Sequence, residues 1–375
     1  MAQIEFPAQP TRDAIYRVYE EAAARGEPVT YEAVTVENSN GHRPHLGASL
    51  VGHHCDRYLW LTFRWVAGET FDGRMLRLFE TGHLAEPRLA HAIRRAGVEL
   101  HTTDPAGRQW RISAVGGHFG GSMDGAGLGF HEAPKTWAVW ECKTSGTKVF
   151  NAMKIEGVHK AKPQHYAQMQ VYMGETSMTR ALYTMVCKET DEVYTEWVHF
   201  DPVEHARLMA KAATIIESSE PPSRISENAS WWQCKFCKFH GVCHEEAAPE
   251  VNCRTCAHST PDVSGESGVW RCNKPEYPDG GGADLKLTVD AQRAGCGEHR
   301  FIPILLEKWA KPIDFADGDV TYQIDGGGTF INGSGHGGLS SEEVHKCENK
   351  VLLQDLTAVK LAGFANAKIV KEQKL

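Results

Sequence analysis

The spacing of apolar side chains changes along the chain and predicts which segments form helices. In residues 11–25, Ile15, Val18 and Tyr19 recur about one helical turn apart, and Gly26 is a suitable stop. Residues 46–66 have a similar spacing, which predicts a second helix that Ser49 caps and that contains Cys55. The other segments with helical spacing are 71–97 (as one helix or two), 162–174, 201–218 and 350–375.

Short apolar runs bounded by turn residues predict strands between these helices. The runs are 98–101, 108–115, 118–123, 137–143, 180–188, 193–200, 320–324 and 328–332. The glycines that follow Asp124, in residues 125–129, are typical of a hairpin. Strands interleaved with helices in this way predict an α+β fold, with a mixed central sheet flanked by helices.

Length, composition and charge narrow the class of protein. The 375 residues can hold two or three domains, and 41% hydrophobic and 23% charged residues are ordinary for a soluble globular protein. No apolar run approaches the roughly 18 residues that span a bilayer, so no membrane partner is expected. The first residues lack a basic segment followed by an apolar one, which favours a cytoplasmic protein without a secretory signal.

The net charge of −8 argues against indiscriminate coating of nucleic acid, although it leaves room for a local basic groove. Residues 143–162 carry five lysines and a single acid, Glu156. This run is either part of such a groove or a solvated helix face.

The stretch Trp137 to Lys143 has the strongest chemical signal. Residues two apart on a strand point to the same face, so Glu141 and Lys143 project together, with Val139 behind them. Asp124 ends the preceding predicted strand. Two carboxylates beside an ammonium suit a hard divalent cation and the metal-assisted hydrolysis of a phosphodiester. The same pattern also fits an edge strand with a solvated ion pair.

Gln168 and Tyr172 lie four residues apart, which places both on one face of the helix predicted downstream. Asp124, the Glu141-x-Lys143 pair and this Gln-x-x-x-Tyr helix together resemble the PD-(D/E)XK nuclease superfamily, in its RecB-like and lambda-exonuclease-like branch. Met123 stands where that family has proline. The resemblance implies a restriction-endonuclease-like α/β core over roughly residues 45–245.

The resemblance also implies a role for each site residue. Asp124, Glu141 and the backbone carbonyl of Cys142 would hold Mg²⁺ or Mn²⁺, and Lys143 would orient the attacking water. Gln168 and Tyr172 would position the nucleic acid. Glu86, about four residues after Gly82, would support the metal or a second ion, and is otherwise an exposed helix carboxylate. His83, one turn earlier, could also reach the site.

Eight of the eleven cysteines fall into two sets that look like metal ligands. Cys234, Cys237 and Cys243 form a C-x2-C-x5-C motif after the last core helix, and Cys55 begins an early Cys-x-Arg. Both features are similar to the iron–sulfur members of the RecB-like nucleases, of the CRISPR-associated-exonuclease type, and imply a [4Fe–4S] cluster. Zinc, with His240 or His244 as substitute ligands, and no metal at all remain alternatives.

The second set has the spacing of a zinc site, with two residues between the first pair of cysteines. Its members are Cys253, Cys256, Cys272 and Cys296. His299 is an alternate fourth ligand, and unpaired thiols are the remaining alternative. Because this segment has few large apolar residues, we expect it to need a metal to fold. Cys142, Cys187 and Cys347 are expected to pack in the interior.

These patterns divide the chain into four parts. They are an N-terminal helical segment (1–45), a nuclease core closed by the first cysteine set (46–246), a zinc-binding module (247–310) and a small β/helical segment (311–375). The resemblance favours a metal-dependent DNA exonuclease of phage or prokaryotic recombination or repair, with a single-strand annealing or other recombination protein as a candidate partner. An endonuclease or resolvase with the same site is the first alternative. A metal-stapled DNA-binding protein with a vestigial site is the second. Strand polarity and oligomeric state stay open.

Overall fold

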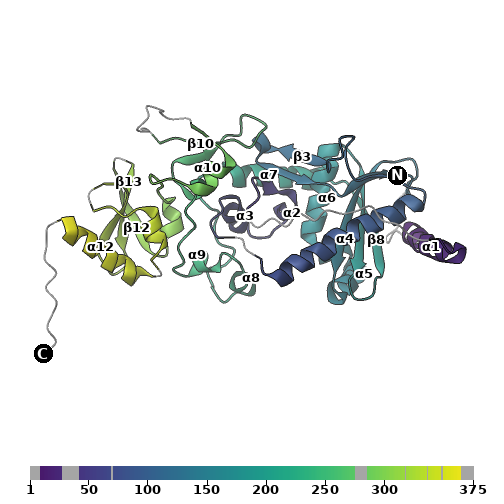
Figure 1. The fold of residues 1–375 in the computed structure, drawn as a ribbon, viewed down its shortest axis with the longest axis horizontal. Helices are drawn as coiled ribbons and strands as arrows, with labels where there is room; N and C mark the ends of the chain where they lie inside the picture. The colour runs from purple at the N-terminus through teal and green to yellow at the C-terminus, as the bar shows by residue number, and fades with distance from the viewer. Residues whose placement is uncertain are drawn as a thin grey trace.

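The computed structural model describes residues 9–27, 42–68, 71–274, 285–316, 318–335, 337–347 and 349–364. The described chain is elongated (Figure 1). A five-stranded sheet with its helices occupies one end and a small C-terminal sheet the other, with the cysteine-bearing segments between them.

The main sheet has the order β2-β5-β6-β7-β8, in which β6 and β7 are parallel and the other neighbours antiparallel. Its strands are β2 (Glu99–His101), β5 (Gly125–Leu128), β6 (Ala138–Ser145), β7 (Arg180–Cys187) and β8 (Val193–His199). The parallel pair needs a crossover, which α5 (Thr147–Ala161) and α6 (Pro163–Thr176) supply. The register places Glu141 opposite Tyr183.

Helices cover both faces of this sheet. Along β6, Trp140 packs in a core with residues of α1 (Gln9–Arg25) and α4 (Gly73–Arg95). Val139 packs on the opposite face with residues of α5, α6 and α7 (Pro202–Glu217). The alternation in β6 is therefore buried on both sides, and the prediction of an α+β fold with a mixed sheet flanked by helices is confirmed.

A second, three-stranded sheet precedes Asp124 in the chain. It has the order β1-β4-β3, formed by β1 (Leu46–Gly47), β3 (Arg111–Ala114) and β4 (Phe119–Ser122), with a 3₁₀ turn at Val115–Gly117. β4 and β5 do not pair with each other but belong to different sheets. Asp124 lies in the short connection between them and stands at a junction of two sheets. The glycine-rich segment that follows it forms β5, which pairs antiparallel with β6, so a hairpin does follow Asp124 as predicted.

The prediction of a single helix over 46–66 was wrong. After β1 the chain forms α2 (Ala48–Val51) and α3 (Asp56–Phe63), and Cys55 is the residue before α3 and not within it. The break follows from close packing of Gly52 on α6, where an added Cβ would lie 2.7 Å from the Cβ of Ala167. His53 then turns back, and its Nδ1 accepts the backbone N–H of Cys55 at 3.1 Å.

Within the predicted range 71–97 the chain forms one helix, α4 (Gly73–Arg95), which continues through Pro87. Proline removes the hydrogen bond to the carbonyl four residues earlier, on His83. His83 is exposed, so water can satisfy that carbonyl, and the helix persists. At its start the side chain of Asp72 accepts the backbone N–H of Met75 at 2.7 Å.

The cysteine-bearing segments follow α7. Three cysteines of the first set lie around α8 (Trp232–Lys235) and α9 (His240–His244), whereas Cys55 precedes α3. The second set lies around β9 (Ser259–Pro261), β10 (Trp270–Cys272), β11 (Leu285–Leu287), α10 (Val289–Ala294) and a 3₁₀ turn at Cys253–Thr255. Trp270 belongs to the same core as Val139, so the second set shares packing with the main sheet.

Arg254, inside the Cys253-x-x-Cys256 motif, ties this segment to the core. Its guanidinium is fully buried and stacks 3.7 Å from the ring centroid of Trp65. It donates to the carbonyl of Phe63 at 3.0 Å and to that of Pro44 at 2.8 Å, and also to the side chain of Gln292.

The C-terminal part has its own core beneath an antiparallel sheet of order β12-β13-β14. Its elements are a 3₁₀ turn (Pro303–Leu306), β12 (Ala310–Ala316), β13 (Asp319–Ile324), β14 (Thr329–Asn332), α11 (Ser341–His345) and α12 (Lys350–Phe364). The rest of the predicted final helix, 365–375, lies outside the described residues. In the ranges described, no helix is long and apolar enough to cross a bilayer.

Candidate active site and cysteine sites

Glu141 and Lys143 lie on the face of β6 predicted for them. The ammonium of Lys143 pairs with Oε1 of Glu141. Glu141 is fully buried, and its second oxygen, Oε2, has no hydrogen-bond partner in the structure. Because a buried carboxylate oxygen without a donor is costly, this atom identifies a position where a cation or a proton would be favourable.

Asp124 is hydrogen-bonded to β6, the strand that carries this pair. β5 pairs with β6 only as far as Gly125, opposite Trp140. Beyond that point the edge of β6 is open, and the backbone N–H of Cys142 donates to Oδ2 of Asp124 at 2.7 Å. The side chain of Asp124 therefore takes the place of a β5 residue and lies beside the Glu-Cys-Lys segment.

Gln168 and Tyr172 share one face of α6, as predicted, and hold the Asp124 connection in place. The hydroxyl of Tyr172 donates to the carbonyl of Ser122 at 2.7 Å, and Nε2 of Gln168 donates to that hydroxyl at 3.0 Å. Only glycine fits at position 121, because an added Cβ would lie 2.8 Å from the Tyr172 hydroxyl. Both side chains are buried and bond to protein groups in this structure.

Glu86 approaches from α4 and completes a group of three carboxyls. Burial, reinforced by Asp124, raises the pKa of Glu86 to about 7. Burial also raises the pKa of Glu141 to about 8, and that of Asp124 above its ordinary value. Burial alone would lower the pKa of Lys143, but the carboxylates of Glu141 and Asp124 raise it above its usual range. Such a cluster favours added positive charge. His83, the other α4 candidate, is exposed to solvent.

His165 and Tyr183 form a polar pair beside this group that the sequence analysis did not identify. Nδ1 of His165 lies 2.8 Å from the Tyr183 hydroxyl, and Tyr183 is opposite Glu141 in the sheet. Burial, followed by the charge of Lys143, lowers the pKa of His165 to about 3, so the imidazole is neutral. His165 is one helical turn before Gln168, and that spacing is a signal that could have identified it.

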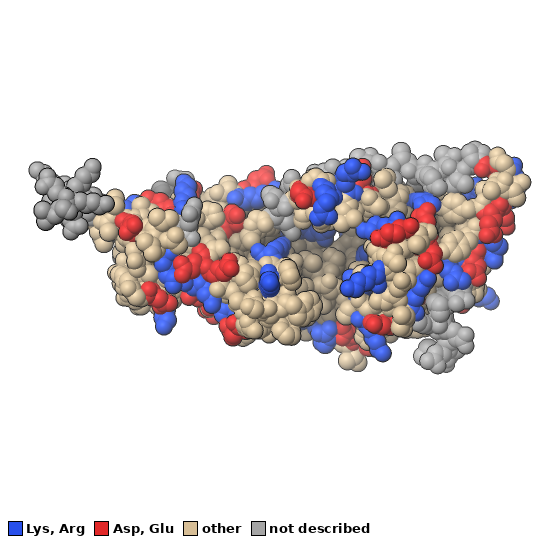
Figure 2. All heavy atoms as spheres, turned by 90° about the horizontal axis from the view of Figure 1, so that it is seen from below, with Lys and Arg blue, Asp and Glu red and all other residues tan. Residues whose placement is uncertain are grey.

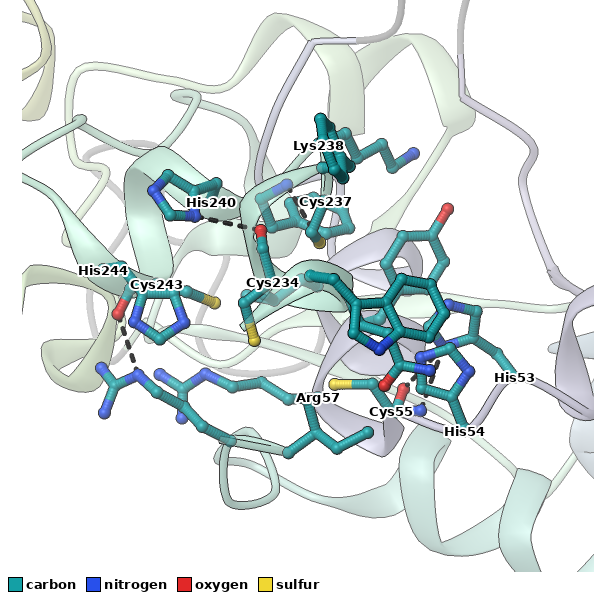
Figure 3. A pocket seen from close by; sticks show the side chains of 18 residues that line it. His53, His54, Cys55, Arg57, Cys234, Cys237, Lys238, His240, Cys243 and His244 are labelled. Carbon is teal, nitrogen blue, oxygen red and sulfur yellow. Dashed lines mark hydrogen bonds between the residues drawn. The ribbon is translucent and has the colours of Figure 1, made fainter. Parts of the chain in front are cut away.

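The four cysteines of the first set line one cavity of about 420 Å³, although Cys55 is far from the other three in the sequence. Figure 3 shows the thiols of Cys55, Cys234, Cys237 and Cys243 on the walls of this space. The backbone N–H of Phe239 donates to Sγ of Cys237 at 3.4 Å. Burial raises the pKa of the Cys243 thiol, and nearby Arg57, of the Cys-x-Arg motif, opposes that increase.

The second set lines a smaller cavity of about 120 Å³. Its walls include Cys253, Cys256, Cys272, Cys296 and His299. Burial and the neighbouring thiols raise the pKa of Cys253 to about 12, and burial raises that of Cys256 to about 11. Nε2 of His299 lies 3.1 Å from the hydroxyl of Thr255. The three leftover cysteines, 142, 187 and 347, are buried, as predicted.

In the described residues, no group of three or more His, Cys, Asp or Glu side chains is already arranged around a single metal position, and this includes the three carboxyls beside Lys143. In the first set this arrangement is compatible with a cluster, since each thiolate of a cubane binds a different iron and the sulfurs stay further apart than around one ion. In the second set the thiols would have to rotate inward on binding zinc.

Comparisons with known proteins found matches only among solved structures. No protein-family profile matches the chain, and no curated protein matches its sequence. Among solved structures, a protein designated SSO0001 is similar at 16% identity and a TM-score of 0.34, over 62% of this chain and 95% of the other. An alkaline exonuclease (LHK-Exo) from Laribacter hongkongensis matches at 19% identity and a TM-score of 0.32, over 46% and 86% of the two chains.

The structure of LHK-Exo in complex with dAMP matches at 16% identity and a TM-score of 0.30, with the same coverage of 46% and 86%. Because both identity and TM-score are low, the functional argument rests on the residues of this chain.

Proposed function

We propose that the chain is a Mg²⁺- or Mn²⁺-dependent deoxyribonuclease that hydrolyses phosphodiester bonds as an exonuclease, in phage or prokaryotic DNA recombination or repair. One observation supports the proposal most strongly. Asp124, Glu141 and Glu86 come together around Lys143, and the buried Oε2 of Glu141 has no partner. A purely structural ion pair would not gather three carboxyls around one ammonium, because their mutual repulsion in a buried site is unfavourable.

The donor set fits a hard divalent cation. Asp124, Glu141 and the Cys142 carbonyl would hold the ion, with Glu86 in support, and oxygen ligands of this kind suit Mg²⁺ and Mn²⁺ better than zinc. A divalent cation supplies a coordinated water of lowered pKa and offsets charge on the scissile phosphate. Lys143 would orient the nucleophile and stabilise charge that develops on the phosphate. Tyr172, bonded to Ser122, would keep Asp124 in position, while Gln168 holds the tyrosine hydroxyl.

The two cysteine sets would hold different groups, and the cavity volumes support that distinction. The cavity of about 420 Å³ has room for a [4Fe–4S] cluster on Cys55, Cys234, Cys237 and Cys243, whereas the cavity of about 120 Å³ suits a single Zn²⁺. A cluster at the first set would join the segment before α3 to the segment after α7. Its role would therefore be structural, because it would close the nuclease core.

The test is digestion of a linear duplex labelled at its 5′ or 3′ ends beside a covalently closed circle, with Mg²⁺ or Mn²⁺. We expect the parent protein to release nucleotides from one end of the linear substrate and to leave the circle intact. Asp124→Asn should lose this activity while staying folded. Cleavage of the circle would assign an endonuclease to the same site, and a folded, metal-loaded parent that cuts neither substrate would refute the nuclease proposal.

A further inference from the structure

Three aromatic rings are exposed on the segment that carries the first cysteine set. The exposed fractions are 44% for Trp231, 62% for Trp232 and 81% for Phe236. Phe239 in the same segment is buried at 1%, so the fold can enclose a ring here where it serves packing. Large aromatic side chains gathered on a surface usually mark a binding site, because their exposure to water is unfavourable.

The same segment has a local charge opposite to that of the whole chain. From Ser230 to His244 there is no aspartate or glutamate, although the chain carries a net charge of −8. Lys235 and Lys238 are exposed within it. The ammonium of Lys235 lies 5.8 Å from the ring centroid of Phe236, so at least one cation stands directly beside an exposed ring. This combination is complementary to a polyanion with flat, apolar groups.

The aromatic segment is close to the helix that supports the candidate active site. Gly52, at the end of α2, would place an added Cβ 2.8 Å from Cα of Gln164, in the first turn of α6. His53, the next residue, lines the cavity together with Trp232 and Phe236. Gln168 lies on α6 one turn beyond Gln164. Figure 2 shows that this side of the molecule is hollowed near its middle, with Lys and Arg side chains around the hollow.

We propose that Trp231, Trp232 and Phe236, with Lys235 and Lys238, form a surface on which unpaired bases of single-stranded DNA stack; this rests on the proposed nuclease function for the choice of DNA. Aromatic rings stack on any base whose face is exposed, and the lysines neutralise the intervening phosphates. A duplex already stacks its own bases, so the rings select single strands. A protein partner is less favoured, because the segment combines its rings with an uninterrupted excess of positive charge.

The test measures binding of a fluorescently labelled single strand of about 15 nucleotides, and of a blunt duplex, by anisotropy. All proteins carry Asp124→Asn, so that no substrate is cut during the titration. We expect Trp232→Ala and Phe236→Ala each to weaken single-strand binding about 5- to 100-fold, as the loss of one stacked base does. Duplex binding should change less than about threefold, and Trp232→Phe should keep most of the single-strand affinity because it keeps a ring.

Phe315→Ala is the matched control, because Phe315 is also exposed, at 65%, but lies on β12 of the C-terminal sheet. It should bind both DNAs like the parent. Thermal unfolding and metal content of each variant show whether the cysteine segment is intact. If Trp232→Ala proves unstable, Phe236→Ala and Lys235→Glu decide the question, since both replace exposed side chains.

Single-strand affinities equal to that of the parent in folded variants would overturn the proposal. An equal loss of single-strand and duplex binding would also overturn it, by indicating general charge attraction. If the surface instead mediates capture of a second protein and binds no DNA, the assignment to single strands is wrong. Hydrolysis of bis(p-nitrophenyl) phosphate by the parent with Mn²⁺ tests the nuclease site separately, so a failure there leaves the binding result interpretable.

Discussion

Replacing Lys143 by alanine tests the candidate active site through both rate and stability. Lys143 is the cation that pairs with the fully buried Glu141, and 25% of its own side chain is exposed. Removing one partner of a buried ion pair costs about 3–5 kcal/mol of unfolding free energy, because the other charge remains unpaired. Here the loss should be about 2–3 kcal/mol, since solvent reaches Lys143 and Glu141 can take up a proton, its pKa being about 8.

Lys143→Ala should also lower the rate of hydrolysis by the protein that remains folded. An ammonium that stabilises charge in the transition state contributes on the order of 10²–10³ in rate, so Lys143→Ala should be at least about 100-fold slower under saturating Mg²⁺. Release of nucleotides from labelled duplex gives the rate. Urea unfolding in buffer without added Mg²⁺ gives the stability.

Lys350→Ala is the control for this comparison. Its side chain is 26% exposed, close to the value for Lys143, and its ammonium lies 3.1 Å from Oε1 of Glu246. Glu246 is itself 39% exposed, so this pair is solvated and should be worth at most about 1 kcal/mol, with no change in rate. Activity within about threefold of the parent in folded Lys143→Ala, or a stability loss equal to that of Lys350→Ala, would refute the reasoning.

Three further predictions concern the cysteine sets and a buried carboxyl. Protein purified without oxygen should be brown, with a broad absorption near ~400 nm and about four irons per chain, and Cys234→Ser should lose the colour; a colourless preparation with two zincs would make the first set a zinc site. About one zinc per chain should also be present and be lost in Cys256→Ser, as elemental analysis would show. Burial raises the pKa of Glu196 to about 7 from 4.5, although the N–H of Val158, 2.8 Å away, opposes the shift. Protonated Glu196 therefore contributes fully to the unfolding free energy below pH 4.5, and this contribution is lost as the pH rises through 7. Urea titrations at pH 5 and pH 8 should show that Glu196→Gln becomes more stable relative to the parent at the higher pH.

The elements that carry the candidate site could be predicted because their signals are local. Alternation in residues 137–143 placed Glu141 and Lys143 on one face with Val139, and helical spacing placed Gln168 and Tyr172 together. Both arrangements depend only on the period of one element. The structure confirms these placements.

What the sequence could not predict depends on contacts between elements. The separation of β4 and β5 into two sheets is set by the pairing of β4 with β1, which lies 73 residues earlier in the chain (Leu46 pairs with Phe119), and no local pattern encodes it. The bond from Tyr172 to the carbonyl of Ser122 likewise requires the tertiary fold. The break before Cys55 arises because Gly52 packs on α6, which overrides the helical spacing of residues 46–66.

The buried guanidinium of Arg254 has a consequence for how the molecule would melt. Its donors end on the carbonyls of Phe63 and Pro44, which precede the main sheet, while its own backbone lies between two cysteines of the second set. If that segment opened alone, the guanidinium of Arg254 and the carbonyls of Phe63 and Pro44 would lose their hydrogen bonds, so partial opening is unfavourable. We therefore expect these regions to unfold in a single cooperative transition. If the second set holds zinc as proposed, a chelator that removes the zinc should lower the melting temperature of that transition.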